Sequence, residues 1–197
     1  MEYRALAQAA EPSSTVHRCA LELELLSGFA SLPPFHEDAP TFAENAAGKA
    51  LYYSRFCDGL VFADDSGLVV PALDGAPGVL SARYAGPGAS SAERNAKLLR
   101  ELQGKTAEKR AAYFVCAIAL AERGRAKAIV TARVDGEISE TPRGNHGFGY
   151  DPVFYVAELG KGFAEISAYE KNEYSHRGRA FQKLLGFLAY DTLAGKS

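Results

Sequence analysis

The sequence predicts a protein of the α/β class, in which helices flank a β-sheet, and three observations support this prediction. Over residues 60–68, four apolar residues are followed by two aspartates and a serine, as expected of a buried strand that presents polar groups at its carboxyl end. A turn is the alternative there, because Asp, Ser and Gly are also common turn residues. Two long segments rich in Val, Ile, Phe and Tyr follow at 112–121 and 126–138, and two capping-box motifs mark helix starts.

The elements before this strand are one strand and two helices. Residues 1–10 have a composition that favours a helix, and no strand precedes it. Apolar and acidic residues alternate within 19–26, which predicts a half-buried strand. Thr41 and Glu44 form a capping box, so a helix is expected over about 42–56. Because its apolar positions are mostly alanines, this helix is expected to pack closely.

Beyond the central strand, turn residues precede a second capping box. Residues 74–88 are rich in Gly and Pro and predict a loop. The capping box at residues 90–93 then predicts a helix that ends before Gly104. The two long strands that follow are joined by a turn at residues 123–124, which predicts an antiparallel hairpin.

The C-terminal part is expected to contain a loop, a short strand and a closing helix. A glycine-rich loop covers 142–151 and a short strand covers 152–156. Ser175 is the expected N-cap of the closing helix. Its apolar face is predicted from the i, i+3, i+4 and i+7 spacing of Phe181, Leu184, Leu185 and Leu188.

The composition is that of a globular protein, and a single domain is expected over residues 1–197. With 22 basic and 24 acidic residues, the chain has no overall charge that would favour nucleic acid or an anionic membrane. The three cysteines, the absence of a signal peptide and the absence of an apolar run of membrane-spanning length predict a cytoplasmic protein without disulfides.

Residues that suit nucleotide binding fall in three patches. The patches are the acids Asp64 and Asp65, the loop with Phe148, Tyr150 and Asp151, and the segment with Lys171, His176 and Arg177. Adjacent carboxylates suit a hard cation such as Mg²⁺. Aromatic rings suit a flat base, and Asp151 can accept hydrogen bonds from the N–H groups of that base. Cations at the start of a helix suit anions. Each residue alone also has a structural explanation, such as core packing for Phe148. Their joint placement on predicted loops and element ends favours a nucleotide site.

Four motifs carry a resemblance to a known family. TFAENAAGKA, FADDSGLVVPALDGAPGVLSARYAG, GFGYDPVF and EKNEYSHRGRAFQKLL resemble, in order and spacing, the inosine/xanthosine triphosphate pyrophosphatase family over about residues 21–188. The resemblance implies a two-lobed α/β fold with a long mixed β-sheet and a cleft between the lobes. It also implies a homodimer, and Mg²⁺-dependent hydrolysis of ITP, dITP or XTP to the monophosphate and pyrophosphate, as a house-cleaning activity on the nucleotide pool.

The resemblance assigns a role to each site residue. Asp65 is expected to accept a proton from the attacking water and to contact the metal, with Glu37 as a second metal ligand. The expected substrate contacts are Lys49 on the phosphates, Ser66 beside Asp65, Phe148 stacked on the purine, Gly149, Tyr150 and Asp151 along that wall, and Lys171, His176 and Arg177 over base and phosphates. Donors from His176 and Arg177 favour a carbonyl at purine position 6, and adenine has an amine there.

One departure from the family concerns the N-terminus. Members begin with a strand and a phosphate-binding loop of the form Thr/Ser-Gly/Ser-Asn-x-x-Lys, and neither is found here. We therefore expect that the chain begins about a dozen residues late relative to the family. Two other functions stay open: a purine nucleotide-binding module without turnover, and a related pyrophosphatase that acts on modified pyrimidine nucleotides.

Overall fold

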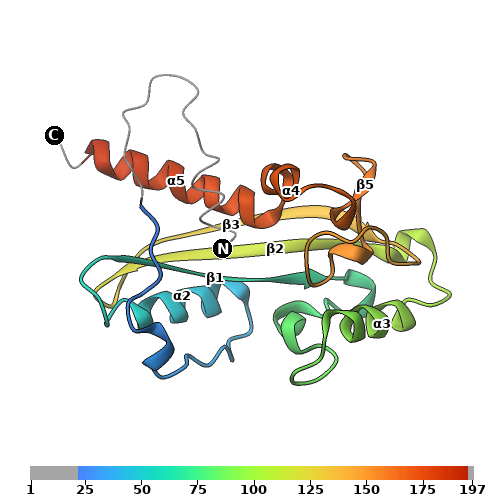
Figure 1. Cartoon of the computed structure of the whole chain (residues 1–197), viewed down its shortest axis with the longest axis horizontal. Coiled ribbons are helices and arrows are strands. Elements are labelled where there is room, and N and C mark those ends of the chain that lie inside the picture. Colours follow the sequence, from blue (N-terminus) through green and yellow to red (C-terminus); the bar gives the residue numbers. More distant parts are fainter. Residues whose placement is uncertain (1–21, 195–197) are drawn as a thin grey trace.

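The computed structural model describes residues 22–194, and the helix predicted over residues 1–10 lies outside them. The strands are β1 (Leu60–Val69), β2 (Ala111–Glu122), β3 (Arg125–Ile138), β4 (Phe154–Val156) and β5 (Lys161–Gly162), and the α-helices are α2 (Phe42–Tyr53), α3 (Ser91–Glu101), α4 (Ala168–Tyr174) and α5 (His176–Ala194). Helices α2 and α3 lie on one side of the sheet, and α4 and α5 lie on the other (Figure 1). The predicted α/β fold is confirmed.

The strands form one sheet in the order β1-β2-β3-β4-β5. All four pairings are antiparallel, so the mixed sheet that the resemblance implied is not seen among the described strands. The predicted hairpin of β2 and β3 is confirmed. Its two turn residues, Arg123 and Gly124, both have positive φ, which matches the twist of the flanking strands.

Strand β1 is longer than the sequence predicted, and this corrects the position of the acids. The strand continues through Asp64 and Asp65 to Val69, and these acids pair with Ile118 and Ala117 of β2. The acids therefore lie within the strand and not at its carboxyl end. Carboxylates are accommodated here because β1 is the first strand in the sheet order and most of its residues are only half-buried.

Successive side chains of β2 point to opposite faces of the sheet, and the core is therefore divided between its two sides. On one face, Cys116, Ile118 and Leu120 pack against α5. On the other face, the alanines at 117, 119 and 121 pack against Ala46 and Ala50 of α2. Because both surfaces of this second contact are built from alanines, the helix backbone approaches the sheet closely, as the sequence predicted.

A third cluster forms the core of a second lobe at the other end of the long strands. It joins Leu68 of β1 to Leu98 of α3 and to Phe114 of β2, and it extends to Phe154 and Phe163. Strands β1, β2 and β3 thus run through both lobes (Figure 1). Residues at the middle of β1 lie where one lobe meets the other.

The predicted caps place the helices correctly, with small changes at the ends. Thr41 accepts a hydrogen bond from the backbone N–H of Glu44 at the start of α2, and Ser90 and Glu93 form a complete capping box at α3. Ser175 accepts from the N–H of Gly178 and caps α5. Helix α2 ends at Tyr53 and not near residue 56, because Ser54 forms its C-cap.

Two predicted strands need correction, and one helix was missed. The described part of the segment 19–26, residues 22–26, has no strand structure. The predicted strand over 152–156 begins only at Phe154, since Asp151–Val153 form a 3-10 helix. Helix α4 was not predicted. It begins at a capping box of Ser167 and Glu170 and has only seven residues, too short for a clear apolar period.

Candidate functional site

Asp65 is the half-buried acid of a cluster formed with Asn45 and Lys49 of α2 and with Glu37 of the preceding loop. Its Oδ1 accepts from the backbone N–H of Ser66 at 3.0 Å, and its Oδ2 is buried without a hydrogen-bond partner. Burial raises the pKa of Asp65, the nearby Glu37 raises it further, and Asn45 and Lys49 oppose the increase. A half-buried carboxylate with one buried, unpaired oxygen and a raised pKa can accept a proton or a cation.

Lys49 holds this cluster together from the second turn of α2. Its Nζ forms an ion pair with Glu37 and donates to the backbone carbonyl of Asp64 at 2.8 Å. The loop that carries Glu37 is fixed nearby, since the N–H of Phe35 donates to the hydroxyl of Tyr53 at 3.1 Å. The structure therefore brings together Glu37, Lys49 and Asp65, which are separated in the sequence.

A cavity of about 150 Å³ lies beside β1 and is lined by residues of both α3 and α5. It is lined by Ser66, Gly67, Ser81, Ala82, Arg94, Phe114, Phe148, Gly149, Tyr150, Asp151, His176 and Arg177. Seven of the eight predicted substrate contacts other than Lys49 are among these residues, and Lys171 is the exception. The cavity is smaller than the roughly 300–1,000 Å³ of pockets that enclose a whole ligand, so it suits one flat ring.

Phe148 is supported by cations and is 53% exposed at the cavity. The Nζ of Lys171 lies 4.4 Å from the ring centroid, and the guanidinium of Arg177 lies 5.2 Å from it. The backbone N–H of Phe148 donates to Asp151 Oδ2 at 2.7 Å. The ring is thus held in place with a large part of its surface open.

Lys171 and Asp151 bind each other, and of the two only Asp151 lines the cavity. They form an ion pair at 2.5 Å, with side chains that are 7% and 2% exposed. Asp151 Oδ2 accepts from both the N–H of Phe148 and the Nζ of Lys171, so this oxygen is engaged with the protein. Lys171 does not line the cavity, so in this structure the pair supports Phe148 from behind.

His176 forms a buried wall of the cavity at the start of α5. Its ring stacks on Phe114 with centroids 4.6 Å apart and an interplanar angle of 7°. Burial lowers the pKa of His176 well below 6.5, and the positive charges of Arg177 and Lys171 lower it further. The imidazole is therefore neutral near pH 7. Its Nδ1 is buried without a hydrogen-bond partner, so it can bind a ligand group.

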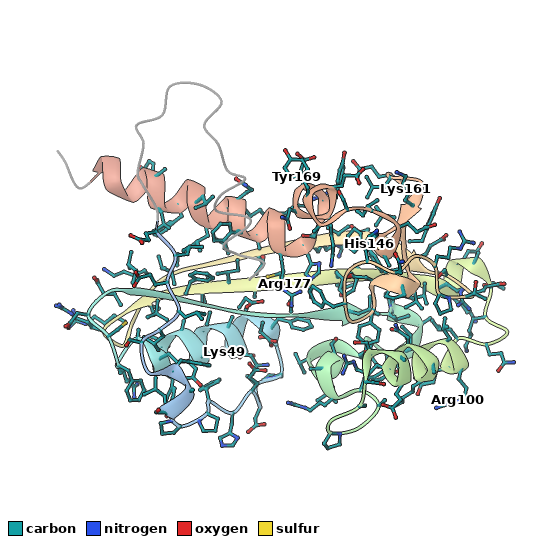
Figure 2. The ribbon with its side chains drawn as sticks, viewed as in Figure 1. Lys49, Arg100, His146, Lys161, Tyr169 and Arg177 are labelled. Atoms are coloured by element: carbon teal, nitrogen blue, oxygen red, sulfur yellow. The ribbon has the colours of Figure 1, made fainter. Side chains whose placement is uncertain are left out.

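Arg177 connects α5 to β1 across the cavity. Its Nε lies 3.4 Å from Asp64 Oδ2, and the Oγ of Ser66 lies 3.4 Å from the same oxygen. Figure 2 shows Arg177 on the opposite side of β1 from Lys49. Successive residues of a strand point to opposite faces, and therefore Asp64 and Ser66 face Arg177 and Asp65 faces Lys49.

Sequence reasoning missed Arg94 and Asn95, which lie in the first turns of α3 and hold the loops around the cavity. Arg94 donates to the carbonyls of Ala82 at 3.0 Å and Ala89 at 2.6 Å. Asn95 is buried, and its Nδ2 donates to the carbonyl of Gly149 at 3.1 Å. The capping box located the helix, but no sequence signal shows that its side chains reach loops 54 residues away.

We expect that Asn95→Ala loosens the loop at residues 147–151. The substitution removes a partly buried hydrogen bond to the carbonyl of Gly149, which costs about 1 kcal/mol. Urea denaturation measures the stability loss, and amide hydrogen exchange over residues 147–151 should become faster. Gln103→Ala, which changes an exposed amide just after α3, is the control and should leave both unchanged. Equal exchange in the two variants would contradict this role.

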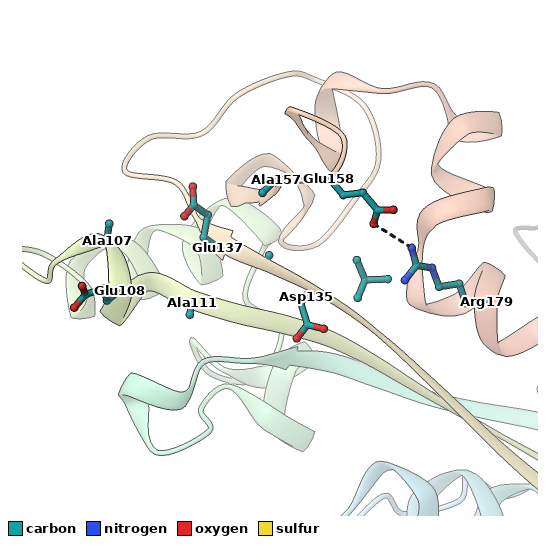
Figure 3. A pocket seen from close by; sticks show the side chains of 10 residues that line it. Ala107, Glu108, Ala111, Asp135, Glu137, Ala157, Glu158 and Arg179 are labelled. Carbon is teal, nitrogen blue, oxygen red and sulfur yellow. Dashed lines mark ion pairs between the residues drawn. The ribbon is translucent and has the colours of Figure 1, made fainter.

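A larger hollow, of about 570 Å³, lies apart from these residues (Figure 3). Its charged residues are Glu108, Asp135, Glu137, Glu158 and Arg179, and Arg179 lies 3.7 Å from Glu158. None of the predicted site residues lines it. Its acidic character does not suit an anionic substrate, so the smaller cavity is the better candidate.

Comparisons with known proteins support the same assignment. The Ham1 family profile matches residues 5–187. A dITP/XTP pyrophosphatase of Geobacillus kaustophilus is 54% identical over 164 residues, which cover 83% of this chain and 80% of that protein. One from Listeria monocytogenes is 46% identical over 164 residues, which cover 83% of this chain and 81% of that protein. No helix within residues 22–194 is long and apolar enough to cross a membrane.

Solved structures show the same fold. A HAM1 protein from Coxiella burnetii is similar with a TM-score of 0.77 and 44% identity, covering 81% of this chain and 82% of that one. The Ham1 protein of Staphylococcus aureus has a TM-score of 0.77 and 40% identity, covering 82% and 83%. The matches in sequence and structure extend over most of the chain, and the chain therefore belongs to the Ham1 family.

Proposed function

We propose that this protein hydrolyses non-canonical purine nucleoside triphosphates, ITP, dITP or XTP, to the monophosphate and pyrophosphate. Relatives about half identical in sequence are named dITP/XTP pyrophosphatases. The observation that carries the proposal is the junction at Asp65 and Ser66. These adjacent residues of β1 belong to an acid cluster and to a ring-sized cavity, respectively. A nucleotide with its base in the cavity can place its phosphates at the acid cluster.

In the proposed reaction, water attacks the α-phosphorus and the bond to the β-phosphate breaks. Asp65 accepts the proton of the water, and pyrophosphate leaves with the bonding electrons. The raised pKa of Asp65 makes the ionised carboxylate a stronger base than an ordinary aspartate. Lys49 lies beside it and provides a positive charge for the phosphates.

We also propose that the acid cluster holds Mg²⁺. The unpaired, buried Oδ2 of Asp65 and the neighbouring carboxylate of Glu37 fit this ion, because Mg²⁺ uses one or two carboxylates together with water and substrate phosphates. When bound, the ion would offset the negative charge of the phosphates. The ion pair with Lys49 would then hold the Glu37 carboxylate in place for the ion.

Selectivity for the base is assigned to the cavity. His176 and Arg177 line it and can donate to a carbonyl at purine position 6. A base with an amine at this position would leave these donors unpaired, which is costly in a buried site. Phe148, with its exposed ring, is the proposed stacking surface.

We extend the proposal to a homodimer in the cytoplasm. The dimer is supported by the family resemblance. The cytoplasmic location is supported by the content of three cysteines, of which Cys57 and Cys116 are free thiols in the described residues.

The test is pyrophosphate release from dITP, XTP, dATP and dGTP with Mg²⁺. We expect faster release from dITP and XTP, and no release once the metal is chelated. Equal rates with dATP would contradict the proposed selectivity. Binding of inosine nucleotides without hydrolysis would favour a binding module, and a preference for thymidine or uridine triphosphates would favour the pyrimidine alternative.

A further inference from the structure

Arg83 is a cation between the cavity and the acid cluster to which neither the family resemblance nor the proposed mechanism gives a role. It is the last residue of a 3-10 helix, Gly78–Arg83, and its side chain is exposed. Its Nη2 donates to the backbone carbonyl of Glu37 at 2.9 Å. The contact joins segments 46 residues apart and brings a guanidinium to the loop that carries an acid of the site.

The backbone before Arg83 is held firmly beside the cavity. Ser81 Oγ donates to the carbonyl of Gly78 and accepts from the N–H of Leu68, and the hydroxyl of Tyr150 donates to the carbonyl of Ser81 at 2.9 Å. Ala82, the residue directly before Arg83, lines the cavity. The position of Arg83 at the edge of the cavity is therefore fixed, and only its side chain has freedom to move.

The charge of Arg83 differs from those of Lys49, Lys171 and Arg177 because no carboxylate within residues 22–190 forms an ion pair with it. Lys49 pairs with Glu37, Lys171 with Asp151 and Arg177 with Asp64. The described partner of Arg83 is a neutral carbonyl oxygen. A guanidinium held in this way keeps its full charge and most of its N–H donors for an anion, and its planar fork matches two oxygens of a phosphate.

We propose that Arg83 binds the phosphate chain of the substrate. This inference rests on the proposed function, since a base in the cavity and a reacting phosphorus near Asp65 require the phosphates to pass between the two. Arg83 lies there, adjacent to Ala82 of the cavity and in contact with Glu37 of the acid cluster. It would act with Lys49, which contacts the same loop through the carboxylate of Glu37.

The experiment measures the binding of inorganic tripolyphosphate to the full chain by calorimetry, in metal-free buffer. Arg83→Gln removes the charge, and because its side chain is shorter it also loses the contact with the carbonyl of Glu37, so the binding of inosine is measured to show that the cavity is intact. Arg100→Gln, an exposed position on α3 far from Lys49 in Figure 2, is the matched control. Arg83→Lys restores the charge without the planar fork.

We expect the dissociation constant for tripolyphosphate to rise about tenfold or more in Arg83→Gln, to recover in part in Arg83→Lys, and to stay unchanged in Arg100→Gln. Binding of inosine, which has no phosphate, should be equal in all four proteins. Equal tripolyphosphate affinity in Arg83→Gln and Arg100→Gln would overturn the proposal. Failure of the proposed function would look different: the unchanged chain would release no pyrophosphate from dITP, whatever its affinity for tripolyphosphate.

Discussion

Asp65→Asn should lower kcat by about 10²–10⁴-fold, the usual contribution of a general base. The amide has nearly the same shape as the carboxylate but cannot accept the proton of the attacking water. Pyrophosphate release from dITP measures the effect, and binding of the inosine monophosphate shows that the base cavity is intact. Asp64→Asn is the matched control, because this neighbouring aspartate faces Arg177 and not the acid cluster. A kcat loss for Asp64→Asn as large as that for Asp65→Asn would remove the special role of Asp65.

The same substitution should not weaken the fold. Burial raises the pKa of Asp65 above 3.8, so the folded protein holds its proton to a higher pH than the unfolded chain does. The stabilisation that comes from binding this proton is fully present below the pKa that Asp65 has in the unfolded chain. It is lost as the pH rises through the pKa that Asp65 has in the folded protein. At pH 7 the ionised carboxylate is therefore a cost, and we expect a melting temperature for Asp65→Asn equal to or above that of the original protein.

In the metal-free protein, the Asp65 carboxyl should take up its proton at a pH above the ordinary pKa of 3.8, because burial raises its pKa. Mg²⁺ bound at Asp65 favours the ionised carboxylate and should lower this pKa. An NMR titration of the carboxyl with and without Mg²⁺ measures both effects, and an equal pKa in the two titrations would contradict metal binding at Asp65.

The second large effect is expected for the buried ion pair behind Phe148. Lys171→Met leaves Asp151 as a buried carboxylate without its cation, and breaking such a pair costs about 3–5 kcal/mol. Urea denaturation of the full chain measures this loss. The pocket should suffer as well, because Phe148 loses the cation beneath its ring, and we expect a higher KM for dITP.

The double variant Asp151→Asn, Lys171→Met serves as the control. With both charges removed, no unpaired buried charge remains, and the neutral amide can still accept from the N–H of Phe148. The double variant should therefore be more stable than Lys171→Met alone. If Lys171→Met lost less than about 1 kcal/mol, the pair would contribute little to the fold and Lys171 would be available to contact substrate directly.

Local signals in the sequence predicted most of the elements. The caps at Thr41, Ser90 and Ser175 identified three helix starts, because a cap depends on residues within one turn. The hairpin was predicted from the apolar runs of β2 and β3 and their short turn. The end of β1 was predicted wrongly: Asp and Ser are common in turns, and only pairing with β2 keeps them in a strand.

The candidate site was predicted in kind but not in arrangement. The sequence indicated acids for a metal, cations for phosphates and an aromatic ring for a base, because side-chain chemistry is a property of each residue. It did not show that Lys171 pairs with Asp151, nor that Asn95 and Arg83 reach distant loops. These contacts join residues 20 to 54 positions apart.

The sequence by itself thus determined the residue types of the site, the helix starts and the hairpin, all of which depend on local chemistry and periodicity. Only the tertiary structure decided which face of β1 each side chain occupies. Asp65 meets the acid cluster, and its neighbours Asp64 and Ser66 meet Arg177, because the strand alternates between two sides of the sheet. The physical reason is packing: α2 covers one side and α5 the other, and each brings its own partners to the strand.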